Sequence, residues 1–296
     1  MINPREQFAL TAADLVESDD SVALVYAEIS GQFFDSVERR HPDRVVNVGI
    51  REQLLVNVGA GFALTGMRPI VHTFGAFLAE RAFEQVKLGF AHQDVGGVLV
   101  GSGGTFDMAQ YGRTHAAPGE IALMDTIPGM QIHAPGTAEE VDAILRRTVA
   151  GDGLHYVRVV GQTNQTPVPL TPGFHVVRRG SGPTVLSLGP TLDAVLAATE
   201  GLDATVLHAS TIRPFDARTL RAVAGTEVVL VEPWFAGTSA HCVSEALADR
   251  PHRLLSLGVP RTEFRHYGRI SEQVRAMGLD PAGLRASITG FLGAAA

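Results

Sequence analysis

The chain has 296 residues, of which 45% are hydrophobic and 19% are charged, as in an ordinary globular α/β protein. A formal net charge of −7 argues against binding to nucleic acid or to an anionic membrane, and the single cysteine, Cys242, excludes an internal disulfide. The first residues hold no apolar signal segment, and no apolar run reaches the ~18 residues of a membrane-spanning helix, so we expect a cytoplasmic protein.

The first half of the chain alternates short apolar runs with longer amphipathic segments. This pattern predicts strands at 21–26, 45–48, 70–73, 98–100 and 155–160, and helices at 4–18, from 51 onward, at 75–90 and at 141–149. A glycine-rich loop occupies residues 101–119, and a loop of that length in a compact domain is usually functional or mobile.

A segment rich in proline and in amide side chains, residues 161–173, follows and is predicted to be an interdomain linker. Beyond it the alternation restarts, with strands predicted at 184–188, 204–207, 227–231 and 253–257 and helices at 191–199, 217–224 and 239–247. Such alternation predicts mostly parallel sheets flanked by helices. The expected fold class is therefore α/β, with two domains at residues 1–165 and 174–296.

One carboxylate, Glu52, stands at a junction between a strand and a helix. The strand at 45–48 ends at Gly49 and the helix begins near residue 51, so Glu52 lies at the sheet edge where open α/β sheets bind ligands. An acid in the first helical turn is also common because it complements the helix dipole. The helix is apolar on several sides, which indicates burial, and a carboxylate at a buried helix end needs a partner.

Several motifs, in their order and spacing, resemble the pyrimidine-binding domain of transketolases. They are Asp-Arg-Val-Val-Asn-Val-Gly-Ile-Arg-Glu-Gln at 43–53, Pro-Ile-Val-His-Thr-Phe at 69–74, Tyr-Gly-Arg-Thr-His at 111–115, Ile-Pro-Gly-Met at 127–130 and Ile-Arg-Pro-Phe-Asp at 212–216. The resemblance covers most of the chain. It implies a pyrimidine-binding domain followed by a transketolase C-terminal domain, and chemistry that depends on thiamine diphosphate.

The resemblance assigns a group of side chains to the cofactor. Glu52 would be catalytic, because it would hydrogen-bond the aminopyrimidine ring, and Ile50 would wedge between the two rings of the cofactor. Phe74 and Phe77, three residues apart at the start of a predicted helix, would stack around the pyrimidine, although core packing is the ordinary role of such a pair. The expected cofactor-binding residues are Ile50, Glu52, Phe74, Phe77, Glu80 and Arg81.

A second group is assigned to the substrate. In transketolases a histidine in the Thr-His pair lines the substrate channel, so His115 is expected to be catalytic, whereas an isolated loop histidine is more often solvated. Arg158 would bind an anion or a sugar phosphate, for which a guanidinium is suited, although a surface ion pair is its ordinary role. The expected substrate contacts are Glu28, Gln32, Tyr111, His115 and Arg158.

The chain departs from the family pattern in the loop that normally touches the sugar. It has Gly103 where transketolases commonly carry a histidine, and Ala109-Gln110-Tyr111-Gly112 where they carry Gly-Glu-Asp-Gly. The handling of the cofactor is therefore expected to transfer better than the identity of the substrate.

The motif that binds the diphosphate through Mg²⁺ is missing. Gly151-Asp152-Gly153 matches its start, but the last asparagine of the chain, Asn164, comes too soon, and the triplet precedes a strand. We interpret the triplet as a surface turn. We expect no metal site in this chain, so a separate chain must supply the diphosphate domain and the Mg²⁺.

The sequence is thus interpreted as the second half of a split transketolase, which moves a two-carbon ketol unit from a ketose to an aldehyde. Its expected partner is an N-terminal transketolase subunit, in an α2β2 heterotetramer, without nucleic acid or membrane. Three alternatives stay open: the beta subunit of a 2-oxoacid dehydrogenase, a specialised carbon–carbon ligase with a non-pentose substrate, and a non-catalytic scaffold. Thr114-His115 favours the transketolase side, and Glu52 with the two phenylalanines argues against a scaffold.

Overall fold

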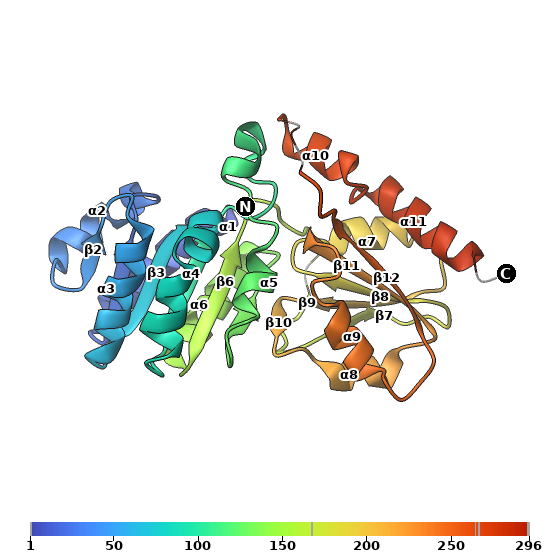
Figure 1. Cartoon of the computed structure of the whole chain (residues 1–296), viewed down its shortest axis with the longest axis horizontal. Helices are drawn as coiled ribbons and strands as arrows, with labels where there is room; N and C mark the ends of the chain where they lie inside the picture. The colour runs from blue at the N-terminus through green and yellow to red at the C-terminus, as the bar shows by residue number, and fades with distance from the viewer. Residues whose placement is uncertain (1, 167, 264, 266, 295–296) are drawn as a thin grey trace.

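Two α/β bodies, each built around a mostly parallel sheet, make up the computed structural model, which describes residues 2–166, 168–263, 265 and 267–294 (Figure 1). The first sheet has the strand order β10-β5-β6-β4-β3-β1-β2 and the second the order β12-β11-β8-β9-β7. The predicted fold class is confirmed.

The first sheet aligns the carboxyl ends of its strands at one edge. Tyr26 pairs in register with both Asn47 and His72, and Phe74 pairs with Ser102. All pairs are parallel except β5 with β10. The strands are β1 (Val22–Tyr26), β2 (Val45–Asn47), β3 (Arg68–Phe74), β4 (Gly97–Ser102), β5 (Gln131–His133), β6 (Leu154–Val159) and β10 (Thr211–Arg213).

Helices cover both faces of this sheet. One face carries α1 (Pro4–Ser18), α2 (Gly31–Arg40) and α6 (Ala138–Ala150), whose buried residues share a core with alternate residues of the strands. The other face carries α3 (Glu52–Leu64), η1 (Phe77–Arg81), α4 (Phe83–Gln85), η2 (Val86–Ala91) and α5 (Glu120–Met124). The capping side chains fit these starts, since Asn3 and Thr137 accept hydrogen bonds from the first turns of α1 and α6.

The segment predicted as a helix at 75–90 is helical over nearly all of that range, but it is not one regular α-helix. The segment consists of two π-helical stretches, η1 and η2, on either side of the single turn α4. A π-turn closes an i to i+5 hydrogen bond, which a periodicity of 3.6 residues cannot reveal, and such turns are frequent at functional sites. The predicted loop at 101–119 also contains a short 3₁₀ helix, η3 (Ala109–Thr114).

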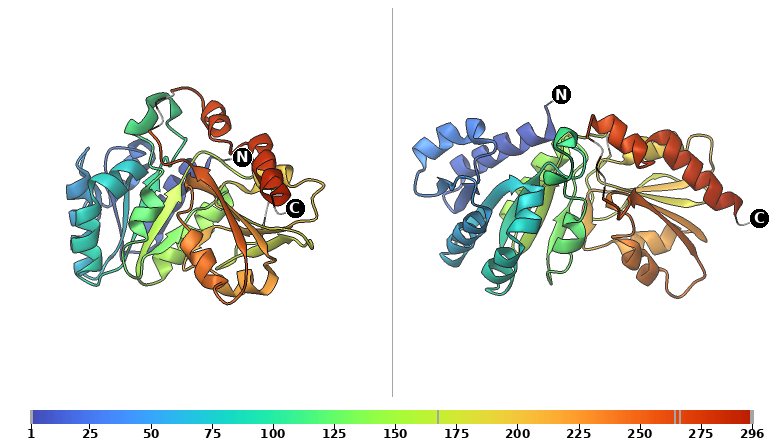
Figure 2. Two further views of the ribbon diagram at one scale, coloured as in Figure 1. Left: turned by 45° about the vertical axis from the view of Figure 1, so that its right-hand side comes forward. Right: turned by 45° about the horizontal axis from the view of Figure 1, so that its top comes forward.

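The second sheet is likewise covered on both sides, with α7, α10 and α11 on one face and α8 and α9 on the other (Figure 2). Its strands are β7 (His175–Arg178), β8 (Thr184–Leu188), β9 (Thr205–Ala209), β11 (Glu227–Phe235) and β12 (Arg253–Val259). Its helices are α7 (Leu192–Ala198), α8 (Ala217–Val223), α9 (Ala240–Ala246), α10 (Ile270–Ala276) and α11 (Pro281–Gly293). Among the described residues, no helix is both long and apolar enough to cross a membrane.

The two bodies are joined by more than the linker. Strand β10 follows three strands of the second sheet in the chain, yet it pairs with β5 of the first. Its Arg213 donates two hydrogen bonds, of 2.8 and 2.7 Å, to the Asp125 carboxylate. The linker itself is fastened by buried Asn164, whose side-chain amide donates to the Gly189 carbonyl and whose oxygen accepts from the Leu192 amide. These contacts hold the two sheets in a fixed relation.

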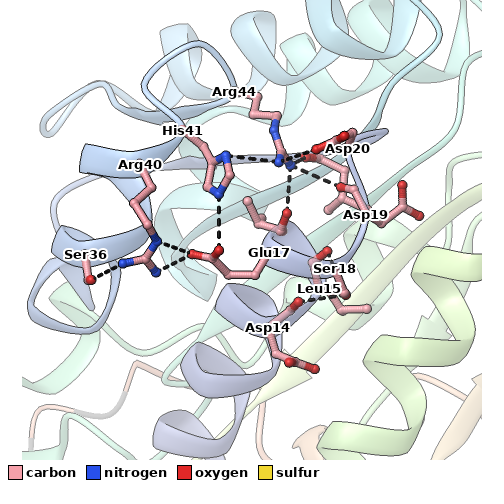
Figure 3. A network of polar contacts seen from close by, with 12 residues as sticks. Asp14, Leu15, Glu17, Ser18, Asp19, Asp20, Ser36, Arg40, His41 and Arg44 are labelled. Atoms are coloured by element: carbon pink, nitrogen blue, oxygen red, sulfur yellow. Dashed lines mark hydrogen bonds and ion pairs between the residues drawn. The ribbon is translucent and has the colours of Figure 1, made fainter.

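A polar network at the opposite end of the sheet anchors the start of β2 (Figure 3). The buried Arg44 guanidinium donates to the carbonyls of Val16, Asp19 and Val22 at 2.8 to 3.1 Å, which ties β2 to the end of α1. Glu17 on α1 accepts hydrogen bonds from Arg40 on α2. This network fixes the frame from which β2 leads to the Glu52 junction.

Candidate active site

The Glu52 carboxylate is buried, with 2% of the residue exposed, and in the part of the chain that the structure describes it has one hydrogen-bond partner. Its Oε2 accepts a hydrogen bond of 2.6 Å from Nη1 of Arg81, which comes from η1. The Arg81 side chain is 41% exposed, so its guanidinium can leave for solvent. The buried Glu52 carboxylate therefore has a charged partner, Arg81, whose place a ligand could take.

An aromatic cluster adjoins this ion pair. Arg81 lies over the Phe77 ring, with 4.1 Å between the guanidinium carbon and the ring centre. Phe74 and Phe77 meet edge to face at 5.9 Å, and the His115 ring lies 5.6 and 5.1 Å from them. The two phenylalanine rings contact each other, but the residues do not share one helix as predicted, because Phe74 ends β3 and Phe77 begins η1.

His115 closes the cluster from the loop at 101–119. Its Nδ1 lies 2.9 Å from the Thr114 hydroxyl, which donates its own hydrogen to the Tyr111 carbonyl. The hydroxyl must therefore accept from Nδ1, which leaves Nε2 of a neutral ring as a proton acceptor. Tyr111 is 50% exposed, and its ring lies 5.2 Å from His115 at the outer side of the cluster.

Two further predicted cofactor residues lie on the surface of the same region. Ile50 follows the left-handed turn at Gly49 and is 71% exposed, a large value for an aliphatic side chain. Glu80 keeps solvent access on η1, and partial desolvation raises the pKa of its carboxyl. No ring or ion-pair contact among the described residues joins Ile50 to the cluster, so its role stays a prediction.

Glu28 and Gln32 lie beyond the end of β1, at the same sheet edge. Glu28 forms part of the loop between β1 and α2, and the exposed Gln32 lies in the first turn of α2. Among the described residues, no contact connects either side chain directly to the aromatic cluster. Their assignment to the substrate also stays a prediction.

Arg158 is placed differently from the expectation. It is 1% exposed, its Nε donates over 2.5 Å to Oε1 of Glu120, and its Nη2 lies 3.2 Å from the Thr105 hydroxyl. Burial raises the pKa of the Glu120 carboxyl, which also accepts from the Tyr156 hydroxyl. Such an enclosed ion pair speaks against a contact between Arg158 and a substrate anion, and equally against a surface ion pair.

Sequence reasoning missed Arg5. This residue belongs to the first turn of α1 and is partly exposed, and its guanidinium carbon lies 5.9 Å from the centre of the Phe74 ring. Among the described residues it forms no ion pair. No local motif marks it, because only the fold brings the start of α1 to the carboxyl edge of β3.

The departures from the family pattern have structural counterparts. Gly103 has a left-handed backbone, with φ of +75°, and an added Cβ would lie 3.5 Å from the Phe74 ring. A histidine would therefore be strained there.

The triplet Gly151-Asp152-Gly153 is an exposed bend between α6 and β6, so its interpretation as a surface turn is confirmed.

The chain matches two protein families in sequence. Residues 1–164 match the transketolase pyrimidine-binding domain, and residues 174–284 match the transketolase C-terminal domain. It is 46% identical over 97% of its length to an uncharacterized 33.6 kDa protein in the fasciation locus of Rhodococcoides fascians, 94% of which is covered. It is 32% identical to the 1-deoxy-D-xylulose-5-phosphate synthase of Acidovorax ebreus, covering 97% of this chain and 47% of the synthase. The chain thus spans about half the length of the synthases that it matches.

The fold also matches solved structures. A split-gene transketolase, described as an inactive β4 tetramer, has a TM-score of 0.85 with 24% identity, and 98% of each chain is covered. The transketolase of Campylobacter jejuni has a TM-score of 0.78 with 14% identity, over 98% of this chain and 46% of that one. With both domain families matched along its length, the chain belongs to the transketolase family.

Proposed function

We propose that this chain is one half of a two-chain thiamine diphosphate enzyme that transfers a two-carbon ketol unit from a ketose to an aldehyde. The observation that carries the proposal is the Glu52 carboxylate, which is buried at the carboxyl edge of the first sheet and whose one hydrogen-bond partner within the described residues is the partly exposed Arg81.

The residues present fit the pyrimidine half of that cofactor. A buried carboxylate suits a ring nitrogen that must be hydrogen-bonded, and Phe74 and Phe77 offer apolar ring faces beside it. When bound, thiamine diphosphate supplies a carbon nucleophile and an electron sink for carbonyl chemistry. Glu52 would hold a proton at the ring nitrogen once Arg81 has swung away, and the exposed Ile50 would support the bend between the two rings.

The other half of a cofactor site must come from elsewhere. Among the described residues, no group of three or more histidine, cysteine, aspartate or glutamate side chains is placed to hold a metal ion. We assign the Mg²⁺ and the diphosphate to a partner chain that resembles the N-terminal part of a transketolase. The α2β2 assembly belongs to this proposal.

An exposed apolar strip beside Glu52 supports a partner. Leu54 is 45% and Leu64 60% exposed on α3, the helix that Glu52 begins, and Ile50 precedes it. The exposed Gly61 of the same helix has open space where a side chain would be. We assign this exposed side of α3 to the contact with the partner chain. The description of the split-gene neighbour as an inactive β4 tetramer fits the requirement for a second type of chain.

The substrate is proposed to differ from the usual pentose phosphates. Arg158 is engaged with Glu120, Gly103 offers no side chain, and Tyr111 places a ring where transketolases carry an acid. Arg5, which forms no ion pair among the described residues, is a guanidinium that could take an anionic group. A carbon–carbon ligase with a non-pentose substrate is the second candidate, which the matches to 1-deoxy-D-xylulose-5-phosphate synthases favour.

The test is reconstitution with candidate partner chains. We expect no turnover and poor cofactor binding by this chain alone, and turnover by the purified pair with a panel of ketoses, 2-oxoacids and aldehydes. Calorimetry with thiamine diphosphate and Mg²⁺ measures the binding, and mass measurement of the complex reports the subunit ratio. Efficient turnover by the purified chain alone would overturn the two-chain proposal. An intact complex that binds no cofactor would favour the scaffold.

A further inference from the structure

The loop that carries Glu28 has a strained backbone. Of the three non-glycine residues with positive φ in the described part of the chain, two lie in this loop, Glu28 at 63° and Ser30 at 65°. Residues with a side chain rarely adopt the left-handed region, and they keep it where the surroundings enforce it, often at functional sites. Glycine would fit both positions without strain, so contacts around the loop must hold these two residues in place.

Asn47, at the end of β2, holds the first half of the loop. Its Oδ1 accepts hydrogen bonds from the backbone amides of Glu28, at 3.2 Å, and of Gly49, at 2.9 Å. Its Nδ2 donates to Oε2 of the Glu28 side chain over 3.3 Å. One amide group thus fixes the backbone and the carboxylate of Glu28, and it connects them to the turn that leads to Ile50 and Glu52.

His72, on β3, holds the loop at both of its ends. Its backbone carbonyl accepts from the Ala27 amide at 3.1 Å, and its ring Nε2 lies 3.1 Å from the Ser30 hydroxyl. The ring Nδ1 lies 3.1 Å from the Val100 carbonyl, which can only accept, so Nδ1 carries the hydrogen and Nε2 accepts from Ser30.

The ring of His72 is held rigidly in this tautomer. It is fully buried and packs against Phe8, with ring centres 4.3 Å apart. Burial lowers the pKa of His72 to about 3, so Nε2 remains an acceptor at neutral pH. Glu28, by contrast, is exposed, and among the described residues its Oε1 has no partner.

We propose that Asn47 and His72 are positioning residues that hold the strained loop so that the Glu28 carboxylate is preset at the edge of the candidate site. A carboxylate in that place accepts hydrogen bonds from substrate hydroxyl groups and repels a negatively charged group. The inference rests on the proposed function for its substrate, which would carry hydroxyl groups where it passes Glu28. The holding of the loop is a property of this chain alone.

Hydrogen exchange of the isolated chain tests whether Asn47 and His72 hold the loop, and it needs no enzyme activity. In Asn47→Ala and Ser30→Ala, we expect the backbone amides of residues 27–31 to exchange roughly tenfold faster, as for the loss of one hydrogen bond. Asn47→Asp keeps the acceptor for the two amides and should retain the protection. Asn57→Ala, on the exposed side of α3, is the matched control. Loop amides that exchange in Asn47→Ala and Ser30→Ala as in wild type would overturn the proposal.

Steady-state kinetics of the reconstituted pair test the role. Asn47→Ala should raise KM for the hydroxylated substrate about tenfold with little change in kcat, and it should add nothing in a Glu28→Ala background. Asn47→Asp should raise KM although its loop stays protected, because a second carboxylate faces Glu28. Equal effects of Asn47→Ala with and without Glu28 would refute action through Glu28. An inactive pair would refute the proposed function, and the exchange result would then decide the positioning role.

Discussion

Each of the two sheets places a buried glutamate near the carboxyl end of its strands, although the strand orders differ, and the two glutamates are held differently. Glu232, on β11, is fully buried and accepts hydrogen bonds from Nε1 of Trp234 at 2.7 Å and from the Ser239 amide at 3.2 Å. Glu52 is almost as buried, but its partner is the exposed guanidinium of Arg81. The partners of Glu232 are fixed in the core, whereas the side chain of Arg81 reaches solvent and could release the Glu52 carboxylate to a ligand.

A buried carboxylate at the edge of a sheet is not by itself a ligand-binding site. What separates the two edges is the partner and the surroundings. An aromatic cluster adjoins the Glu52–Arg81 ion pair, and the exposed Leu54 lies two residues further along α3, whereas Trp234 and Ser239 enclose Glu232. The fold provides the position in both cases, but Glu232 is fully enclosed, whereas the arginine partner of Glu52 reaches solvent.

The largest expected effect concerns Arg158, which lies between the two edges, with its guanidinium carbon 5.7 Å from the centre of the Trp234 ring. Arg158→Met leaves the Glu120 carboxylate buried without a countercharge. We expect the free energy of unfolding to fall by about 3–5 kcal/mol, the usual cost of removing one partner of a buried pair. Urea denaturation measures this.

The double variant Glu120→Leu with Arg158→Met is the control, since replacing both partners by apolar groups should restore much of the lost stability. An Arg158→Met variant with wild-type stability and a raised KM for a phosphorylated substrate would reinstate Arg158 as a substrate contact. It would also remove one difference between the two edges.

The next effect is a pH dependence that belongs to the closed edge. Burial raises the pKa of Glu232 to about 7. Below the unfolded pKa the group is protonated in both states. As pH rises to about 7 the unfolded state ionises first, so stability falls, by about 3 kcal/mol in total at ~1.4 kcal/mol per pH unit. Glu232→Gln should lose this dependence, so its stability relative to wild type should rise between pH 5 and pH 8.

Denaturation of both proteins at several pH values gives the difference curve. A flat difference curve would show that Glu232 ionises in the folded state as readily as in water. The pKa of Glu232 would then no longer distinguish its sheet edge from the edge that holds Glu52.

The smallest expected effect concerns Arg5, at the open edge. Arg5→Ala should raise KM about tenfold for a substrate with an anionic group, on the scale of one hydrogen bond to a charged group, without changing stability. Arg5→Lys keeps the charge and should lose less. An unchanged KM for anionic substrates in Arg5→Ala would leave the open edge without an anion contact in this chain.

The regular elements of the fold could be predicted because their patterns are local. The helix at 4–18 and the strand at 184–188 match α1 and β8. Strand β10 has only three residues, and its pairing with β5 depends on a contact made 78 residues away in the chain, as between Thr211 and His133. The periodicity of hydrophobic residues does not predict such a pairing. It does not predict the π-turns of η1 and η2 either, because their spacing differs from that of an α-helix.

The candidate site could be predicted where a motif carries it and not where the fold does. Glu52, Phe74, Phe77, Arg81 and His115 come together as one connected group. Arg158 lies at the end of a strand that reaches this edge, but its guanidinium forms a buried ion pair with Glu120, which is 38 residues away in the sequence. Arg5 is distant in sequence from every motif, so only the packing of α1 on the sheet places it beside Phe74.

The central claim is tested most directly by the rate at which the thiazolium carbon of thiamine diphosphate exchanges hydrogen for deuterium in the reconstituted two-chain complex. With Glu52→Gln, the complex should assemble and bind the cofactor, and the exchange should slow by roughly 100-fold or more, the scale for the loss of an acid–base group. With Glu232→Gln, the exchange should keep the wild-type rate. Wild-type exchange in Glu52→Gln would contradict the account and make Glu52 an acid that only complements the start of its helix.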